Sequence, residues 1–437
     1  MKTFFSLPAP FRRFLVADSL ILMSTSVAQV VLPWLIALNG GARDLAVFAS
    51  AVALMTFIAM PALSPLGDRL PKQQLVMFGL LLYTIESLVI ALLATIDHYN
   101  IALLVVLEMG GVACYSLVAP IMSNAPADLL EPNTLTHAVS LQKGIQSLGR
   151  LVGPVVAGAV IATFGSKAAL WLHAILPLVA IAFTRNIGLS RSASSTATTR
   201  PLHRWKTDLM RGAKAVWTVH IERYWSLINF VSWLFAAPAV GMLVPLKVHA
   251  LGLSGAWLAS CEAGLAVGIL AGSFYLSAKI IACCGRYAAR IASGLALGLS
   301  LAVAGLAQSP WLLLIAFVAC GLANATLLLV GLTHRMLARP KAFRTRMSGA
   351  TMTLNQIAAA AGPALAGLAL THWSVNEVYA AFGVLTAIAS SLIILIKGFK
   401  HFVNLDHESV DGWYGRQYPD VFSEENEPTQ SKVATPA

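Results

Sequence analysis

The chain has 437 residues, of which 57% are hydrophobic and 11% charged, and its mean hydropathy is +0.74. Soluble domains carry about 25% charged residues, so this composition excludes a soluble globular fold. The formal net charge of +11 is compatible with nucleic-acid binding. The positions of the basic residues, described below, argue against a nucleic-acid partner.

Twelve long apolar stretches follow one another along the chain. A run of about 20 apolar residues crosses the bilayer core as a helix, and these runs lack the alternation of polar and apolar residues that membrane strands show. The sequence therefore predicts an all-α membrane protein with twelve transmembrane helices. The predicted spans cover residues 14–38, 45–66, 75–96, 101–123, 138–163, 168–186, 224–247, 255–277, 288–307, 311–333, 347–371 and 376–397.

The basic residues are distributed unequally between the two sides of the membrane. With the N-terminus placed inside, the outer loops hold only Arg43, Lys167 and Lys247 of the 30 Lys and Arg. Lys and Arg accumulate on the cytoplasmic side of membrane proteins. We therefore predict a multi-pass protein of the plasma membrane, the inner membrane in bacteria, with both termini in the cytoplasm. We also expect the basic loops to contact anionic lipids of the bilayer.

Two landmarks indicate an internal duplication. The run from Gly153-Pro154 to Gly158 recurs 209 residues later as Gly362-Pro363 to Gly367, and Pro33 is matched by Pro245 after 212 residues. Each repeat then holds six spans, an even number, so the two repeats have the same orientation in the membrane. Parallel repeats of this kind form the two rocking bundles of many transporters.

A polar segment separates the repeats. Residues 189–223 begin with a Ser- and Thr-rich run, and apolar residues then recur at helical spacing from Trp205 to Trp217 between basic side chains. This pattern predicts a cytoplasmic linker with an amphipathic helix on the membrane surface. After residue 400 the chain is acidic and poor in apolar residues, which predicts a disordered cytoplasmic tail over 400–437. The predicted bundles cover residues 1–188 and 224–399.

The loop after the second span carries a recognisable pattern. Leu66, Asp68, Arg69 and Lys72 follow a spacing that resembles the cytoplasmic signature of the major facilitator superfamily, and they lie between spans 2 and 3 as in that family. The resemblance implies the twelve-helix, two-bundle major facilitator fold. It also implies that Asp68, with Arg69 and Lys72, helps to close the cytoplasmic mouth, since a contact made in one state only shifts the equilibrium. The alternative is that these charges only anchor the topology.

The family places an Arg partner for Asp68 at the end of span 4. This sequence has Ser123-Asn124-Ala125-Pro126 there, without an Arg. The sequence therefore does not identify a partner for Asp68.

The fifth span contains Gly149, Gly153, Pro154 and Gly158. Small residues at this spacing allow helices to approach closely, and a proline permits a bend. The run resembles the antiporter signature of exporters in the superfamily, which implies export; ordinary helix packing is the alternative. The neighbourhoods of Pro245 and Glu262 also resemble the branch that exports macrolides and siderophores of the enterobactin type.

Several polar and ionisable residues are predicted inside the membrane, where they are costly and usually functional. Lys143, Gln146 and Arg150 share one helix face, which must face a cavity or acidic partners. The family resemblance implies that spans 1, 4, 7 and 10 line the cavity, so Asp18 and Glu108 rank first as proton carriers. We expect His173 at the membrane interface. The remaining candidates for contacts with protons or substrate are Glu86, Glu262, Asn229 and Trp233.

The sequence contains neither a phosphate-binding Gly-x-x-x-x-Gly-Lys-Ser/Thr motif nor a cluster of metal ligands. We expect no cofactor, no metal, no enzymatic activity and a monomeric protein. The leading hypothesis is a secondary exporter of an amphipathic small molecule, either a drug-like toxin or a siderophore, driven by proton antiport. The alternative is an importer of a small solute or a lysolipid flippase on the same fold. A membrane sensor without transport activity is disfavoured because both halves keep the Gly-Pro helix.

Overall fold

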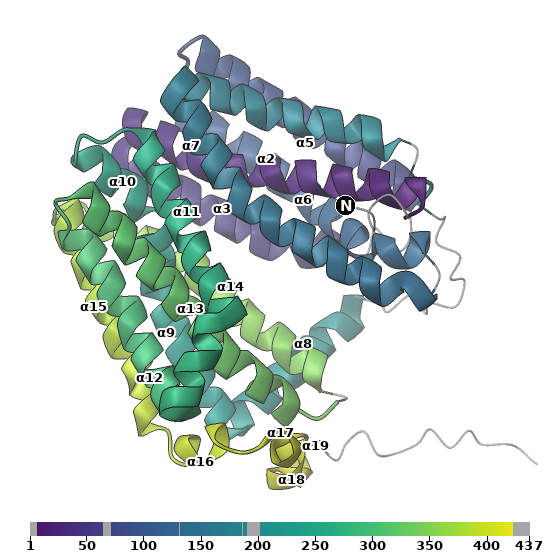
Figure 1. Ribbon diagram of the computed structural model, residues 1–437, viewed down its shortest axis with the longest axis vertical. Coiled ribbons are helices and arrows are strands. Elements are labelled where there is room, and N and C mark those ends of the chain that lie inside the picture. The colour runs from purple at the N-terminus through teal and green to yellow at the C-terminus, as the bar shows by residue number, and fades with distance from the viewer. Residues whose placement is uncertain are drawn as a thin grey trace, which may run out of the picture.

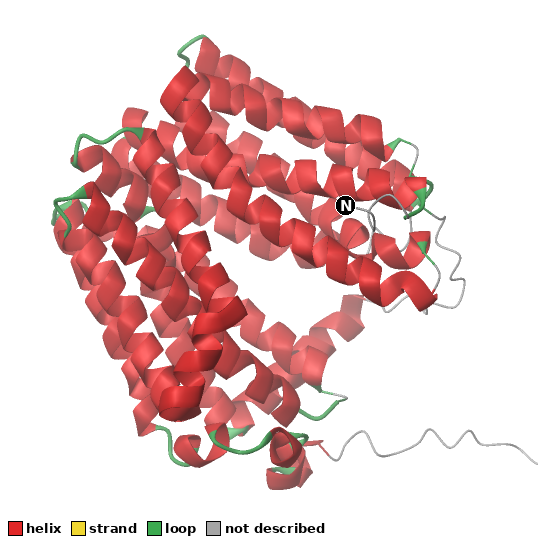
Figure 2. Cartoon of the chain, in the orientation of Figure 1, coloured by secondary structure: helices red, strands yellow, loops and turns green. Residues whose placement is uncertain are grey.

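The structure is a computed structural model that describes residues 7–63, 71–130, 132–185, 187–189, 202–341 and 343–422. Every regular element in these ranges is helical, and Figure 2 shows the helices as long rods joined by short connections. The prediction of an all-α protein is confirmed.

The first half of the chain forms a bundle of long apolar helices. Its last helix is broken at Gly165, which has a φ of 83° and so adopts a backbone conformation that favours glycine. The elements are α2 (Ala9–Asn39), α3 (Gly41–Leu63), α5 (Lys72–Thr95), α6 (Ile101–Leu129) and α7 (Pro132–Thr184).

The second half repeats this arrangement. Its first span is bent by 42° between α9 and α10, and α12 is broken at Gly285, which has a φ of 79°. The elements are α9 (His220–Gly241), α10 (Leu243–Ala250), α11 (Gly255–Ala271), the π-helical turn η1 (Gly272–Leu276), α12 (Ser277–Leu306), α13 (Pro310–Ala338), α14 (Arg344–Ala369), α15 (Val375–Ser391) and η2 (Leu392–Leu395).

Eight helices in the described ranges are long and apolar enough to cross a membrane, or nine if the bent pair forms one span. That number counts the chain on both sides of Gly285 as one helix. The chain can also be divided at Gly165 in α7 and at Gly285 in α12, and α14 can be included. The helices are then consistent with the twelve predicted spans.

The two halves touch at one end and diverge towards the other (Figure 1). They meet through two equivalent pairs of helices, α7 with α11 and α3 with α14, and through contacts of α2 with α10 and α11. Gly158 of α7 packs on Ala259 of α11, and Gly367 of α14 packs on Ala46 of α3. Because Gly158 and Gly367 are the matching residues of the duplicated motif, the repeat in the sequence is also a symmetry of the interface.

The helix α8 (Leu202–Thr218) forms in the segment where the sequence predicted an amphipathic helix. It packs against α14, where Gly212 lies against the backbone of Arg346. Met210 and Trp217 remain largely exposed on its other side. Residues 190–201 of the predicted linker lie outside the described ranges.

The tail differs from the expectation. Residues 400–422 were predicted to be disordered, but they form parts of four short helices, α16 (Phe399–Val403), α17 (His407–Val410), α18 (Trp413–Gln417) and α19 (Pro419–Phe422). Phe402 and Tyr414 are completely buried, and their rings stack at 5.6 Å between centroids. The acidic composition misled the prediction because a few aromatic residues suffice to dock the tail on the bundle. Residues 423–437 are outside the described part of the chain.

Candidate functional site

The small-residue run of α7 lies at a junction of three helices. Gly149 faces Leu22 and Gly153 faces Ser26, both on α2, and Gly158 faces α11 of the other half. A side chain at Gly153 or Gly158 would collide with its neighbour. The predicted close packing is therefore present, and one helix contacts both halves.

The matching run of α14 shows the same relation within the second half. Gly362 packs against the Leu234 carbonyl and Pro238 of α9, as Gly153 packs against α2. Pro154 and Pro363 are both buried inside their helices. The two halves thus use equivalent glycines for equivalent contacts.

Asp18 is buried on α2, and α7 supplies its hydrogen bonds. The Gln142 and Gln146 side-chain amides donate to Asp18 Oδ2 at 3.2 and 3.0 Å. The exposed Lys143 ammonium donates to Gln146 Oε1 at 3.2 Å, so the predicted cationic face reaches the carboxylate through an amide. Gln142 was missed by the sequence analysis, and the side chain of Arg150 lies outside what the structure describes.

Glu86 and Glu108 come from the neighbouring helices α5 and α6. Glu86 is 7% exposed and packs against Gly111, one helical turn beyond Glu108. Ser87 Oγ lies 3.3 Å from Glu86 Oε2, while Glu86 Oε1 has no hydrogen-bond partner among the described residues. The structure therefore places these two acids near each other inside the first bundle.

His173 is not at the interface, contrary to expectation. It is 1% exposed in the interior of the first bundle. Its Nδ1 lies 2.8 Å from Ser24 Oγ, and its ring contacts Tyr83 edge-on at 5.6 Å. The prediction was wrong because the position of a residue along a span does not tell which side of the helix packs inward.

A short ion pair joins α5 and α6 at one end of the first bundle. Lys72 Nζ at the start of α5 lies 2.7 Å from Asp128 Oδ2 at the end of α6. Both residues belong to the same half, so this pair stabilises the bundle itself. Asp128 lies just beyond the Ser123–Pro126 run where the family has an Arg, and the sequence alone did not single it out. Asp68 and Arg69 lie outside the described ranges.

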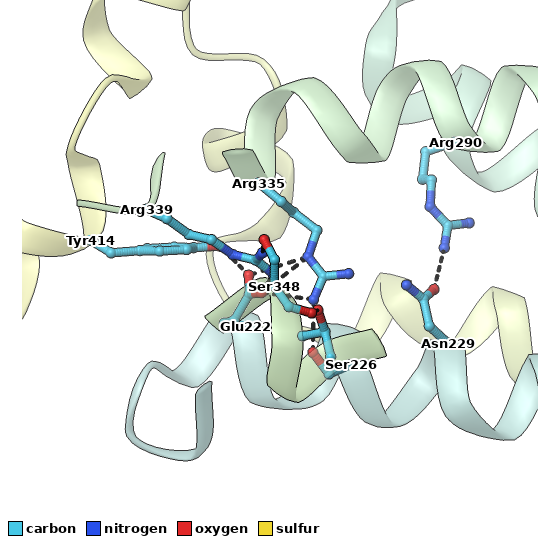
Figure 3. Close-up of polar contacts among 9 residues, drawn as sticks. Glu222, Ser226, Asn229, Arg290, Arg335, Arg339, Ser348 and Tyr414 are labelled. Atoms are coloured by element: carbon cyan, nitrogen blue, oxygen red, sulfur yellow. Dashed lines mark hydrogen bonds and ion pairs between the residues drawn. The ribbon is translucent and has the colours of Figure 1, made fainter. Parts of the chain in front are cut away.

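The corresponding end of the second half holds a buried carboxylate, Glu222 of α9 (Figure 3). Arg335 donates to it from Nη2 at 2.7 Å and from Nε at 3.2 Å, and Arg339 also donates to it. The Tyr414 hydroxyl of the tail donates at 2.8 Å. Burial and the neighbouring Glu222 carboxylate raise the pKa of the Tyr414 phenol well above its usual value, so the phenol remains a donor.

The two arginines are held by further hydrogen bonds (Figure 3). Arg335 Nη2 donates to Ser226 Oγ and Arg339 Nη1 donates to Ser348 Oγ, each at 2.7 Å. The cluster therefore joins α9, α13, α14 and the tail. Sequence reasoning missed it because Glu222 lies in the predicted linker and both arginines follow the predicted span 311–333, so none of the three was among the ionisable residues expected inside the membrane.

The remaining candidates are in the second half. Asn229 of α9 accepts a hydrogen bond from the buried Arg290 of α12 at 3.3 Å, which occupies its side-chain oxygen. Trp233, one turn further along α9, is 38% exposed. Glu262 of α11 makes no hydrogen bond with any residue that the structure describes. The part of the chain that the structure describes contains no group of three or more His, Cys, Asp or Glu side chains suited to a metal ion.

Comparison with known proteins agrees with this architecture. The nucleoside transporter NupG has 12% identity and a TM-score of 0.70, with 89% of this chain and 98% of that chain covered. A POT family transporter in complex with a thioalcohol-conjugated peptide has 14% identity and a TM-score of 0.68, with 92% and 98% covered. At such identities the likeness shows the fold alone.

A curated relative, the multidrug efflux pump Tap of Mycolicibacterium fortuitum, is 27% identical over 232 residues. The aligned part covers 50% of this chain and 55% of that relative, so the chain spans about half of the relative's length. The family model of the Major Facilitator Superfamily matches residues 14–282. With its helical bundles and duplicated glycine-proline helix, the chain belongs to the major facilitator superfamily of membrane transporters.

Proposed function

We propose that the chain is a secondary active exporter that moves an amphipathic small molecule, a drug, toxin or siderophore, out of the cell by proton antiport and alternating access. The observation that carries the proposal is the packing of the antiporter-like run of α7 on α2 and, across the interface, on α11. The name of the curated relative, a multidrug efflux pump, supports export.

The arrangement of the halves supports alternating access. They touch near the turn between α2 and α3 and diverge towards the end where α8 lies (Figure 1). The excess of Lys and Arg supports placing the diverging end in the cytoplasm, in bacteria on the inner face of the inner membrane. We propose that this conformation is open to the cytoplasm and therefore loads the molecule to be exported. Rocking about Gly158 and Gly367 would then open the opposite side.

Asp18 is the best-placed proton carrier. A carrier must be stable both with and without its proton, and buried polar groups need hydrogen bonds in either state. The Gln142 and Gln146 amides donate to the carboxylate, while Gln142 Oε1 is buried without a partner among the described residues. A half-turn of the Gln142 amide would present that oxygen as the acceptor for a protonated Asp18. Because Asp18 and both glutamines join α2 to α7, its protonation would act on the helix that crosses the interface.

The test uses the full chain in lipid vesicles with an imposed pH gradient and ethidium, an amphipathic aromatic cation, as the probe. We expect Asp18→Asn to abolish uphill movement of ethidium and to leave downhill movement intact, because the proposed rocking of the halves does not itself need the proton. Asp97→Asn makes the same chemical change at an exposed acid, whose side chain is 80% exposed, and should transport normally. Uphill transport by Asp18→Asn, or uphill transport without the pH gradient, would refute proton antiport through this residue.

A further inference from the structure

A groove of about 650 Å³ lies where the last transmembrane helix gives way to the tail. On one side the chain is apolar: Leu392, Ile394 and Leu395 are 43%, 49% and 74% exposed, and such residues at the end of a span face lipid acyl chains. Gly398, with a φ of 78°, then turns the chain into α16. The groove therefore lies at the boundary between the apolar bilayer and water.

On the opposite wall of the groove, the backbone at Leu405 is fixed by polar contacts with the bundle. The Leu405 carbonyl accepts a hydrogen bond from Arg286 Nη1 at 2.8 Å, and His334 Nε2 lies 3.0 Å from the same oxygen. The ring of Tyr287 also lines the groove. Asp406 directly follows Leu405, so the position of its backbone is determined by contacts with the bundle.

Two opposite charges line this groove without pairing. The Lys400 ammonium makes a cation–π contact with Tyr287 at 5.8 Å but no ion pair within the described residues. The Asp406 carboxylate makes neither an ion pair nor a capping hydrogen bond there. His401, Asn404 and Ser409 add further exposed polar groups to the lining. The groove thus presents one cation and one carboxylate, separated and both available to a ligand.

We propose that this groove binds the head group of an ethanolamine phospholipid. The phosphate accepts hydrogen bonds from Lys400, with His401 beside it, and the ammonium group donates to Asp406. The acyl chains lie along Ile394 and the exposed apolar face of η2. Phosphatidylcholine has no N–H group to donate to Asp406, and phosphatidylglycerol lacks the positive charge, so the groove selects among head groups.

The experiment places the full chain in nanodiscs with equal amounts of phosphatidylethanolamine, phosphatidylcholine and phosphatidylglycerol. Native mass spectrometry then measures which lipid stays bound. A charge-assisted hydrogen bond contributes about tenfold in affinity, so we expect phosphatidylethanolamine to be retained about tenfold over the other two. Lys400→Gln should lower the retention of all three lipids, because each carries a phosphate, and Asp406→Asn should remove this preference. Lys397→Gln, which removes an exposed cation outside the groove, should preserve it.

Some outcomes would overturn the proposal. Equal retention of phosphatidylethanolamine by the Asp406→Asn variant and the original chain would exclude recognition of the ammonium group. Stronger retention of phosphatidylglycerol would identify a site for anionic lipids instead. If glycerophosphoethanolamine, which has no acyl chains, competes as well as the whole lipid, the groove binds a soluble ligand and the lipid assignment fails.

Discussion

The hydrogen bond from Tyr414 to Glu222 should determine how firmly the tail is docked. Tyr414→Phe removes this donor at 2.8 Å and keeps the ring that stacks on Phe402. A hydrogen bond to a charged group contributes about 1.5–3 kcal/mol. Arg335 and Arg339 still neutralise Glu222 in the variant, so we take the lower end of that range. The equilibrium for detachment of the tail should then shift by about tenfold.

Hydrogen–deuterium exchange of the tail amides measures this detachment directly. The Gly412 amide donates to the Leu337 carbonyl of α13 at 2.9 Å, so it exchanges only when the tail leaves the bundle. We expect its protection to fall about tenfold in Tyr414→Phe, in line with one lost hydrogen bond to a charged group. Amides in the middle of α5, in the other half, should exchange as before.

Tyr418→Phe is the matched control. Its hydroxyl accepts a weaker hydrogen bond from the His220 backbone amide at 3.3 Å, and both groups are neutral. A hydrogen bond between neutral groups contributes about 0.5–1.5 kcal/mol, so the loss of protection at Gly412 should be smaller. Unchanged exchange in Tyr414→Phe, or an equal effect of the two variants, would refute the view that the contact with Glu222 holds the tail.

Three further outcomes are expected. Glu222→Gln leaves the buried Arg339 and the largely covered Arg335 without their carboxylate and should cost about 3–5 kcal/mol, measured as a lower Tm of the purified protein; an unchanged Tm would contradict this role. Gly158→Leu and Gly367→Leu overpack equivalent contacts between the halves, so both should lower initial transport rates at normal protein levels, and loss at only one site would disprove their equivalence. Lys72→Gln and Asp128→Asn break an ion pair that is only about one-fifth exposed; a double-mutant cycle of Tm values should give a coupling of about 1 kcal/mol, and additive effects would show that the pair does not contribute.

The sequence alone was sufficient to establish the class and architecture of the protein. A run of apolar residues long enough to span the bilayer is a local property, so composition and length reveal helices without knowledge of their partners. The duplication is also visible in the sequence itself, because Gly153-Pro154 recurs as Gly362-Pro363 after 209 residues. The structure confirmed the helical class, and the matching contacts of Gly158 and Gly367 explain why small residues occupy both positions.

Only the tertiary structure decided which polar groups meet. Asp18 and Gln142 are 124 residues apart, and Glu222 and Tyr414 are 192 apart. No periodicity in the sequence relates residues at such separations. The direction in which a helix turns each side chain depends on packing with neighbouring helices, and this packing also placed His173 inside the bundle. The tail shows the same limit: its composition favours disorder, but a few aromatic residues and one buried carboxylate on a distant helix provide enough contacts to order it through residue 422.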